Sequence, residues 1–258
     1  MQGIVSILQK GGVGKSTTAV NLAAALSEPE RGNKVLLVDL CPQGTASEHV
    51  GVYGDYHSNE EVDSLAYHLI GKGKGDLRKI IFETENFSTI PSHDSLFEIR
   101  AELEMMEDGP QRLDKVLRPL EKDFDYIIAD SPPEFGIITI NAIVAMKNLI
   151  IPILMEHTSL RAIEDLMDQV EAIRDNLEVD VKILAIVPNR VLNDSVTQDV
   201  KEKLEGLPVV DFDIRKRVDL KKAWVTGQTI FKYKPKSDAV EWYRKLADVV
   251  ENGGVKIE

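Results

Sequence analysis

One stretch, "QKGGVGKSTT" at residues 9–18, restricts the possible folds of this chain more than any other. It follows a short apolar run at Ile4–Leu8, and alanine and leucine then recur at helical spacing through Lys15–Leu26. Glycines between a strand and a helix allow backbone N–H groups to surround an anion at the helix N-terminus, where the helix dipole favours negative charge. The pattern therefore predicts a phosphate-binding loop in an α/β fold. A plain glycine-rich turn, the alternative, does not account for the strand before it and the helix after it.

The loop differs from the consensus G-x-x-x-x-G-K-[ST] at one position, because Gln9 stands where the first glycine belongs. Gly14, Lys15 and Ser16 match the consensus, in which the lysine reaches the β- and γ-phosphates and the hydroxyl binds Mg²⁺. A second lysine, Lys10, is not needed to hold phosphate. It suits either a solvated loop position or a cation that reaches a γ-phosphate across a dimer interface. The predicted nucleotide-binding residues of the loop are Lys10, Gly11, Gly12, Val13, Gly14, Lys15, Ser16 and Thr17.

Apolar runs alternate with helical patterns along most of the chain. Almost uninterrupted apolar runs, typical of strands buried on both faces of a sheet, lie at Val35–Val38, Tyr126–Ala129, Leu149–Leu154 and Val181–Val187. An amphipathic helix spanning residues 160–173 is predicted between the last two runs. This alternation predicts one P-loop NTPase-type domain over residues 1–258. Its sheet should be doubly wound and mostly parallel, with helices on both faces.

The segment from residue 51 to 109 is less regular. A short β-type run lies at Phe87–Pro91, a helix is expected near Asp94–Met106, and a last helix is expected near Asp238–Val250. No apolar run reaches the roughly 18 residues that a membrane span needs. Cys41 is the only cysteine, so an internal disulfide is excluded and a reducing, cytoplasmic compartment is expected.

The charge of the chain is unevenly distributed. A net charge of −12 argues against a general attraction to nucleic acid or acidic lipid. Eight basic residues nevertheless lie between residues 215 and 236, where only Asp219 opposes them. Such a cluster suits contact with nucleic-acid phosphates regardless of sequence, although a solvated basic face would look the same.

Several segments together resemble the ParA/MinD family of partition and positioning ATPases, and the ParA/Soj-like branch is the most similar. "KGGVGKSTTAVNLAAAL" resembles the family's deviant Walker A motif, and "KVLLVDLCPQGTAS" resembles its D-x-D-P-Q-G motif. "FDYIIADSPPEFGIITINAI" is similar to its Walker B segment, and "AWVTGQTIFKY" to its late A-x-x-x-G-x-x-I segment. The resemblance covers nearly the whole chain and is weakest from residue 51 to 109.

The resemblance assigns roles around the nucleotide. It implies that Lys10 contacts the nucleotide of the partner subunit in an ATP-bound sandwich dimer, while Lys15 contacts the phosphates in its own subunit. "VPNR", residues 187–190, lies where the family contacts adenine. Pro188, Asn189 and Arg190 are therefore predicted to bind the nucleotide, with Asn189 touching the base.

Carboxylates and the lone cysteine complete the predicted site. Asp39 and Asp130 each follow an apolar run, and with Ser16 they are predicted to hold Mg²⁺, Asp130 through a water molecule. A turn or helix-capping aspartate is the alternative for Asp130. In the family, the second Asp of D-x-D-P-Q-G positions the attacking water, and here Cys41 takes its place.

The thiol changes what the site is expected to do. With a pKa of about 8.5 a thiol is mostly neutral at pH 7, and it is a poor acceptor for a proton. Hydrolysis is therefore expected to be slow or absent. A nucleophilic or cluster-binding cysteine would need a paired histidine or further cysteines, which the motif lacks. The predicted catalytic set is Lys10, Lys15, Asp39 and Cys41.

The resemblance implies an ATPase that dimerises around Mg²⁺-ATP and binds nonspecific double-stranded DNA as a dimer. It would position a plasmid, chromosome or other cargo with a ParB-like adaptor, in the cytoplasm and on the nucleoid. The DNA contacts would fall on Arg215, Lys216, Arg217, Lys221 and Lys222. The alternatives are an ATP-locked dimer switch without turnover, a MinD-like positioning ATPase and a metabolic P-loop enzyme. The tail "ENGGVKIE" is neither strongly basic nor bulky, which argues against a MinD-type membrane anchor.

Overall fold

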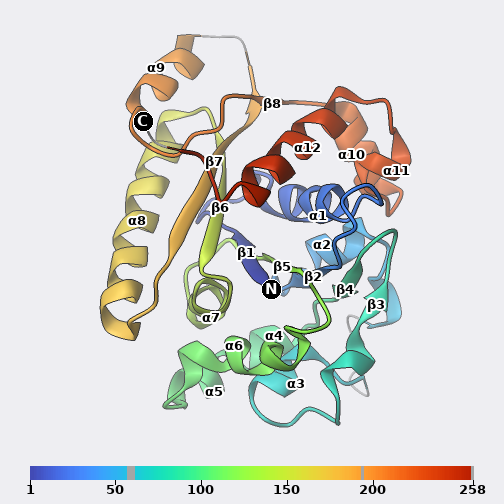
Figure 1. Ribbon diagram of the computed structural model, residues 1–258. Helices are drawn as coiled ribbons and strands as arrows, with labels where there is room; N and C mark the ends of the chain where they lie inside the picture. Colours follow the sequence, from blue (N-terminus) through green and yellow to red (C-terminus); the bar gives the residue numbers. More distant parts are fainter. Residues whose placement is uncertain (57–61, 193–194, 257–258) are drawn as a thin grey trace.

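A sheet with the strand order β3-β4-β2-β5-β1-β6-β7-β8 forms the centre of this computed structural model, which describes residues 1–56, 62–192 and 195–256 (Figure 1). Neighbouring strands run parallel except β3 and β4, which pair antiparallel. The predicted mostly parallel sheet is therefore confirmed. The strands are β1 (Gln2–Ser6), β2 (Val35–Asp39), β3 (Phe82–Glu83), β4 (Ser88–Ile90), β5 (Tyr126–Asp130), β6 (Asn148–Leu154), β7 (Lys182–Val191) and β8 (Ile214–Arg215).

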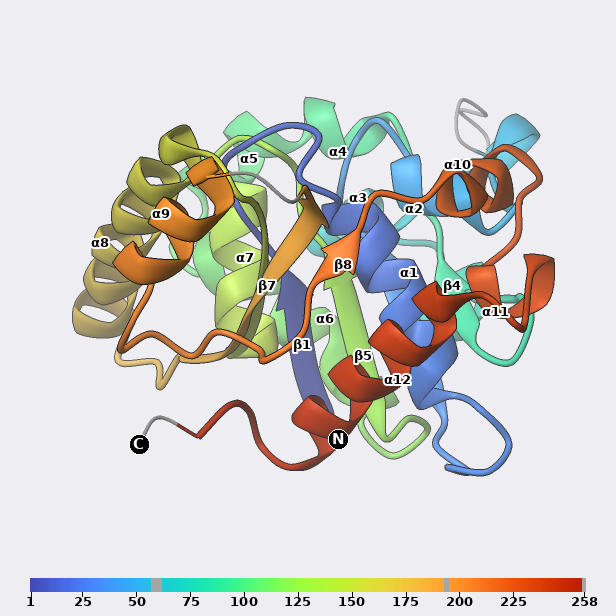
Figure 2. The ribbon, with the colours of Figure 1, turned by 90° about the horizontal axis from the view of Figure 1, so that it is seen from above.

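Helices cover both faces of the sheet (Figures 1 and 2), which confirms the predicted doubly wound architecture. One face carries α1 (Lys15–Leu26), α2 (Thr45–His49), α10 (Val218–Val225), α11 (Ile230–Tyr233) and α12 (Asp238–Glu251). The other carries α3 (Leu65–Leu69), α4 (Ser95–Glu98), α5 (Arg100–Met105), α6 (Arg112–Leu117), α7 (Ile137–Met146), α8 (His157–Leu177) and α9 (Ser195–Lys203). Within these described residues, no helix combines the length and the apolar character of a membrane span.

The alternating direction of strand side chains explains why the strand sequences are apolar throughout. In β2, Leu36 and Val38 belong to the hydrophobic cluster under α7 and α8, whereas Val35 and Leu37 belong to the cluster under α1 and α12. A parallel strand covered by helices on both faces needs apolar side chains at every position. The sequence therefore predicted these strands from unbroken runs rather than from alternation.

The predicted elements differ from the observed ones mainly at their ends. Helix α1 has the predicted bounds. Strand β1 begins and ends two residues before the run Ile4–Leu8, because Gln2 already pairs with β5 and the chain leaves the sheet after Ser6. The helix expected near Asp94–Met106 consists of two short helices, α4 and α5, interrupted at Ile99.

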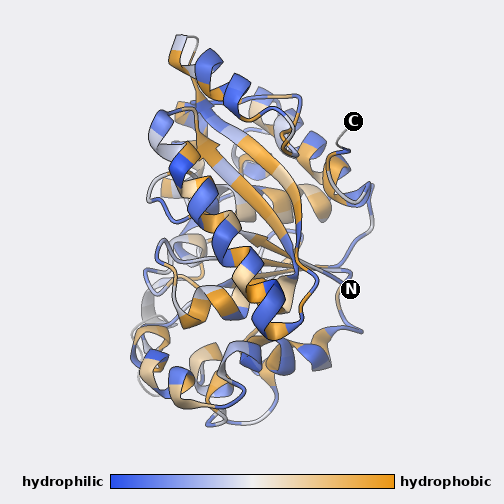
Figure 3. Ribbon diagram, turned by 90° about the vertical axis from the view of Figure 1, so that its left-hand side faces the viewer, coloured by the Kyte–Doolittle hydropathy of each residue, from blue (hydrophilic) through white to orange (hydrophobic). Residues whose placement is uncertain are grey.

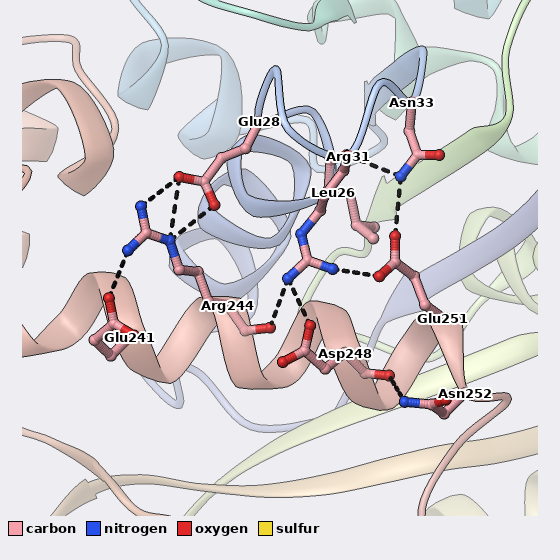
Figure 4. A network of polar contacts seen from close by, with 9 residues as sticks. All are labelled: Leu26, Glu28, Arg31, Asn33, Glu241, Arg244, Asp248, Glu251 and Asn252. Atoms are coloured by element: carbon pink, nitrogen blue, oxygen red, sulfur yellow. Dashed lines mark hydrogen bonds and ion pairs between the residues drawn. The ribbon is translucent and has the colours of Figure 1, made fainter.

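The last helix, α12, packs along α1, and charged side chains join it to the loop after α1 (Figure 4). Arg244 donates to the two carboxylate oxygens of Glu28, at 2.6 and 2.9 Å. Arg31 reaches back to Asp248 and Glu251 on α12. Guanidinium–carboxylate pairs with two parallel bonds are stronger and more directional than single contacts. The network therefore fixes the end of the chain beside its first helix.

Helix α8 lies on the outside of the opposite layer and shows a largely hydrophilic outer face (Figure 3). Its buried apolar residues include Ile163, Leu166, Val170 and Ile173, which recur at helical spacing and face the sheet. This is the amphipathic helix that the sequence predicts over residues 160–173.

The carboxyl ends of β1, β2 and β5 meet at one edge of the sheet. Ser6 of β1 and Asp39 of β2 both lie opposite Asp130 of β5 in the strand register. The glycine-rich loop and the loop that contains Cys41 leave the sheet at this edge. Open parallel sheets bind ligands outside the carboxyl ends of their strands, so the functional site is expected here.

Candidate nucleotide-binding site

The glycine-rich loop connects β1 to α1 in the conformation that its sequence predicts. Gly12 and Gly14 have φ angles of 73° and 97°, which residues with a Cβ rarely adopt. A Cβ on Gly14 would also lie 2.1 Å from Nδ2 of Asn189, so this position needs glycine for space as well as for φ. Helix α1 begins directly afterwards, at Lys15. The loop therefore places a helix N-terminus at the carboxyl edge of the sheet, where an anion is favoured.

Lys15 is a buried cation at the start of α1. The residue is 7% exposed, and its Nζ donates to the carbonyl of Lys10 at 3.1 Å. Burial lowers the pKa of Lys15, while the nearby Asp130 carboxylate acts in the opposite direction. A poorly solvated ammonium group beside the N–H groups of the loop is suited to an anionic ligand, which would supply the missing stabilisation of its charge.

Lys10 contacts the start of α8 in its own chain. Its ammonium group donates to three acceptors there: Glu156 at 2.9 Å, Thr158 at 2.6 Å and Ser159 at 3.2 Å. The hydrogen bond from Lys10 lowers the pKa of Glu156. The contact of Lys10 with a partner subunit's nucleotide stays a prediction, and it would require these bonds to open.

Asp130 is fully buried at the end of β5, and neither carboxylate oxygen has a hydrogen-bond partner among the described residues. Burial and the neighbouring Asp39 raise the pKa of Asp130 well above its usual range, while Ser16 and Lys15 act against them. A buried carboxylate without a partner is costly unless a proton or a cation joins it. Carboxylate and hydroxyl oxygens are ligands that Mg²⁺ prefers, so Asp130 and Ser16 fit the predicted metal.

Asp39 has different surroundings, although it lies beside Asp130 in the register. Its Oδ1 accepts the N–H of Cys41 at 3.0 Å. Its Oδ2 accepts the N–H and the hydroxyl of Ser47, at 2.8 and 2.7 Å. These bonds hold the loop between β2 and α2 in place. Both oxygens of Asp39 thus have partners in the protein, and its part in holding Mg²⁺ stays a prediction.

Cys41 lies in that loop, is 6% exposed and lines the cavity beside the glycine-rich loop. Its carbonyl accepts the hydroxyl of Ser92 at 2.6 Å, which fixes the residue in position. Burial, with the charges of Asp130 and Asp39, raises the pKa of the Cys41 thiol to about 12. The side chain is therefore neutral at pH 7, as the sequence predicted, and lacks the charge of the aspartate expected there.

A cavity of about 570 Å³ joins these elements. The glycine-rich loop and the first turn of α1 form one side of it, and the loops after β2 and β5 form another. The end of β7 and the segment from β8 through α10 complete the wall. Its lining residues are Gly11, Gly12, Gly14, Lys15, Ser16, Thr17, Cys41, Gln43, Thr45, His49, Ser131, Pro133, Asn189, Arg190, Arg215, Lys216, Arg217, Val218, Leu220, Lys221 and Trp224.

The end of β7 supports the glycine-rich loop from behind. Asn189 donates from Nδ2 to the carbonyl of Val13 at 2.7 Å, and its Oδ1 accepts the N–H of Arg190 at 2.9 Å. Both residues line the cavity, whereas Pro188 is buried within β7 and does not. Asn189 keeps one amide N–H for a ligand. The contact of Asn189 with adenine stays a prediction, whereas its hydrogen bond to the glycine-rich loop is observed.

The basic segment predicted to bind DNA lies at the same cavity, which the sequence did not predict. Arg217 pairs with Asp238 of α12, and its guanidinium lies 5.3 Å from the ring centre of Trp242. Arg217 is therefore the member most restricted by its own chain. Lys222 is exposed and lies outside the cavity lining. The members that line the cavity are Arg215, Lys216, Arg217 and Lys221.

The sequence also missed the far wall of the cavity, where α2 and α10 contribute His49, Leu220 and Trp224. His49 is almost fully buried, and burial lowers its pKa to about 4, so it is neutral at pH 7. No motif marks these positions. The one available signal, the resemblance of residues 223–233 to a family segment, does not say what Trp224 faces.

Comparisons with known proteins agree with this geometry. A family model described as an AAA domain, AAA_31, matches residues 1–183. The sporulation initiation inhibitor protein Soj of Bacillus subtilis (strain 168) is 33% identical over 253 residues, which cover 95% of this chain and 96% of that protein. The chromosome partitioning protein ParA of Myxococcus xanthus (strain DK1622) is 31% identical over 247 residues, which cover 92% and 83% of the two chains.

Solved structures share the fold. Cobyrinic acid a,c-diamide synthase from Mycobacterium smegmatis, with bound ADP and magnesium, superimposes with a TM-score of 0.81 at 27% identity, over 98% of this chain and 95% of that one. An ATP complex of a Cyanothece McdA variant gives a TM-score of 0.85 at 23% identity, over 100% and 98% of the chains. At that identity the second likeness concerns the fold alone.

Proposed function

Because this chain belongs to the ParA/Soj family of partition ATPases, we propose that it binds Mg²⁺-ATP, dimerises around it and holds DNA while it positions a cargo. The observation that carries the proposal is the meeting of Lys15, Ser16 and Asp130 at the start of α1. A buried cation faces an anion-binding loop, and a buried carboxylate without a partner among the described residues lies beside a hydroxyl. These groups are what a nucleotide triphosphate and its metal require.

The residues divide the work of binding between them. The N–H groups of the glycine-rich loop and the Lys15 ammonium hold the β- and γ-phosphates. Ser16 and Asp130 would hold Mg²⁺, which supplies neutralisation of phosphate charge when it is bound. Asp39 acts through the backbone, because its hydrogen bonds to Cys41 and Ser47 shape the loop on the γ-phosphate side.

Replacing Lys15 with alanine tests this assignment. Removal of a buried, charge-assisted contact to phosphate should weaken Mg²⁺-ATP binding roughly 100-fold, measured by titration calorimetry. Lys34→Ala is the matched control, because Lys34 is an exposed lysine outside the cavity lining. If the folded Lys15→Ala variant binds ATP as tightly as wild type, the P-loop assignment is wrong.

A second function, an ATP-locked dimer switch, is favoured by the neutral thiol of Cys41. Phosphoryl transfer to water depends on positioning the nucleophile, and a neutral thiol with a pKa of about 12 does not orient a water as a carboxylate does. Cys41→Asp should therefore raise ATP turnover, measured with DNA and the adaptor present. Cys41→Asn is the control, because asparagine has the size of aspartate but no charge. This variant should not raise ATP turnover. Equal turnover in wild type and Cys41→Asp would remove Cys41 from the hydrolytic position.

The remaining partners follow from the family and from surface charge. Exposed basic residues of the segment 215–236, Lys222 among them, contact the phosphates of nonspecific DNA in the ATP-bound dimer. A ParB-like adaptor links the dimer to its cargo and stimulates release. The protein acts in the cytoplasm, on the nucleoid, rather than on a membrane.

A further inference from the structure

The cavity continues well beyond the phosphate-binding loop. Past Thr17 its wall is formed by α10 and α2, which present Val218, Leu220, Trp224 and His49. Apolar side chains and two aromatic rings line this end together with Lys221 of α10, whereas the loop end offers N–H groups and the ammonium of Lys15. A cavity with one phosphate-binding end and one aromatic end matches the two ends of a nucleotide.

Near the loop, Asn189 can offer the base a single amide N–H. Asn189 commits one amide N–H to Val13 and its oxygen to Arg190. A Cβ on Gly14 would lie only 2.1 Å from that amide nitrogen, so the Asn189 side chain is pressed against the loop. A base that extends away from the phosphates can instead contact the side chains of α10 that line the cavity.

Trp224 is placed to offer that area. It is partly exposed, and its ring centre lies 6.5 Å from that of His49 at an angle of 38°. His49 is 1% exposed, and its Nε2 has no hydrogen-bond partner among the residues that the structure describes. The histidine thus supports one side of the indole from the interior, while Trp224 itself lines the cavity.

We infer that Trp224 is the surface on which the base of the bound nucleotide stacks, with Leu220, one helical turn before it on α10, extending the same surface. The inference rests on the proposed nucleotide binding and adds to it a positioning residue for the base. Stacking on an aromatic ring contributes to binding whichever base is present, because every base has a π face. Trp224 therefore supports affinity for nucleotides in general and does not select one base.

Inorganic tripolyphosphate separates this inference from the proposed function, because it has phosphates and no base. Trp224→Ala should weaken ATP binding about tenfold and leave tripolyphosphate binding unchanged, both measured by calorimetry with Mg²⁺. Trp224→Phe, which keeps an aromatic face, should retain most of the ATP affinity. Lys15→Ala should weaken both ligands. If Trp224→Ala leaves ATP affinity unchanged, or weakens both ligands equally, the inference is wrong. If the wild-type protein binds neither ligand, the proposed function is wrong, and the inference, which rests on it, is wrong as well.

A spectroscopic measurement gives a second test that does not depend on removing the ring. The chain has two tryptophans, so Trp242→Phe leaves Trp224 as the only indole. ATP should then quench its fluorescence strongly, and tripolyphosphate should not. Equal responses to the two ligands would show that the indole reports loop closure rather than contact with a base, and would overturn the inference.

Discussion

Asp39 and Asp130 lie opposite each other in the register, yet their surroundings give them different properties. Asp39 accepts hydrogen bonds from Cys41 and Ser47, so its charge is stabilised by the protein. Asp130 has no such partner among the described residues, and burial raises its pKa. A buried carboxylate left without donors is the more suitable one for a metal ion. The residue type alone therefore did not decide which of the two would be available.

His49 makes the stability of the protein depend on pH. Its pKa is lowered by burial to about 4 from the ordinary 6.5. Between these values the unfolded chain takes up a proton that the folded chain does not, so stability falls as the pH falls from 6.5 to 4. The loss from this one group should reach about 3 kcal/mol. Above pH 6.5 both states hold a neutral imidazole and the effect is absent.

The measurement is denaturant unfolding of wild type and His49→Gln at pH 7 and pH 4. Glutamine does not titrate, so the variant should lose less stability on acidification than wild type, even if it is less stable at pH 7. A variant and a wild type with the same loss between the two pH values would contradict the neutral, buried histidine.

At the scale of elements, α12 packs along α1, and polar contacts link α12 to the loop after α1 (Figure 4). Helix α1 begins directly after the glycine-rich loop and is buried along most of its length. Its fixed position depends on α12, which buries Tyr243, Leu246 and Val250 beside it. Ion pairs of Glu28, Arg31 and Arg244 connect the loop after α1 to α12 at the surface of this contact. The last helix therefore supports α1, the helix that follows the glycine-rich loop.

Arg244→Ala should lower the free energy of unfolding by about 1–2 kcal/mol, because it removes a bidentate pair from Glu28, whose side chain is 15% exposed. Denaturant unfolding measures the change. Arg118→Ala is the matched control: Arg118 forms an exposed pair with Asp114 one helical turn away, and its removal should cost only a few tenths of a kcal/mol. If the two variants lose the same free energy of unfolding, the Arg244–Glu28 pair stabilises the protein no more than an exposed ion pair does.

At the scale of the whole molecule, the net negative charge of the chain contrasts with the cluster of basic residues between residues 215 and 236. The chain carries −12, yet four basic residues of the segment 215–236 line the candidate nucleotide cavity. Arg215, Lys216 and Lys221 line that cavity, so variants at these positions would mix effects on nucleotide and on DNA. Lys222 lies outside the lining and gives the clearer test of DNA contact.

Lys222→Ala should weaken retention of nonspecific DNA in the presence of ATP and leave ATP binding unchanged. The slope of log affinity against log salt should become shallower by about 0.9 for each DNA phosphate that Lys222 neutralises. Lys182→Ala is the control, because Lys182 is exposed at the start of β7, at the opposite end of the strand from the site. If the slope is unchanged in Lys222→Ala, Lys222 does not contact DNA phosphates and the predicted DNA contacts lie elsewhere.

By itself, the sequence determined the sheet, the glycine-rich loop between strand and helix, and the positions of Lys15, Ser16 and Asp130 at the carboxyl edge of the sheet. These features depend on local patterns: an apolar run makes a buried strand, glycines allow a loop to surround an anion, and a polar residue after a strand lies at its carboxyl end. Such patterns act over a few residues and can be read in order along the chain. The division of the helix expected near Asp94–Met106 into α4 and α5 shows where local spacing was insufficient.

Only the tertiary structure decided which polar side chains are hydrogen-bonded within the protein and which residues line the cavity. Asn189 supports Val13 from 176 positions away, and Asp39 is held by Ser47 in the next helix. The basic segment and Trp224 reach the cavity because α10 packs beside α2 on the same face of the sheet. No local pattern records these contacts, since burial and hydrogen-bond partners depend on residues that are distant in the chain. The motif therefore predicts where phosphate would bind, while the packing of α10 decides which side chains line the rest of the cavity.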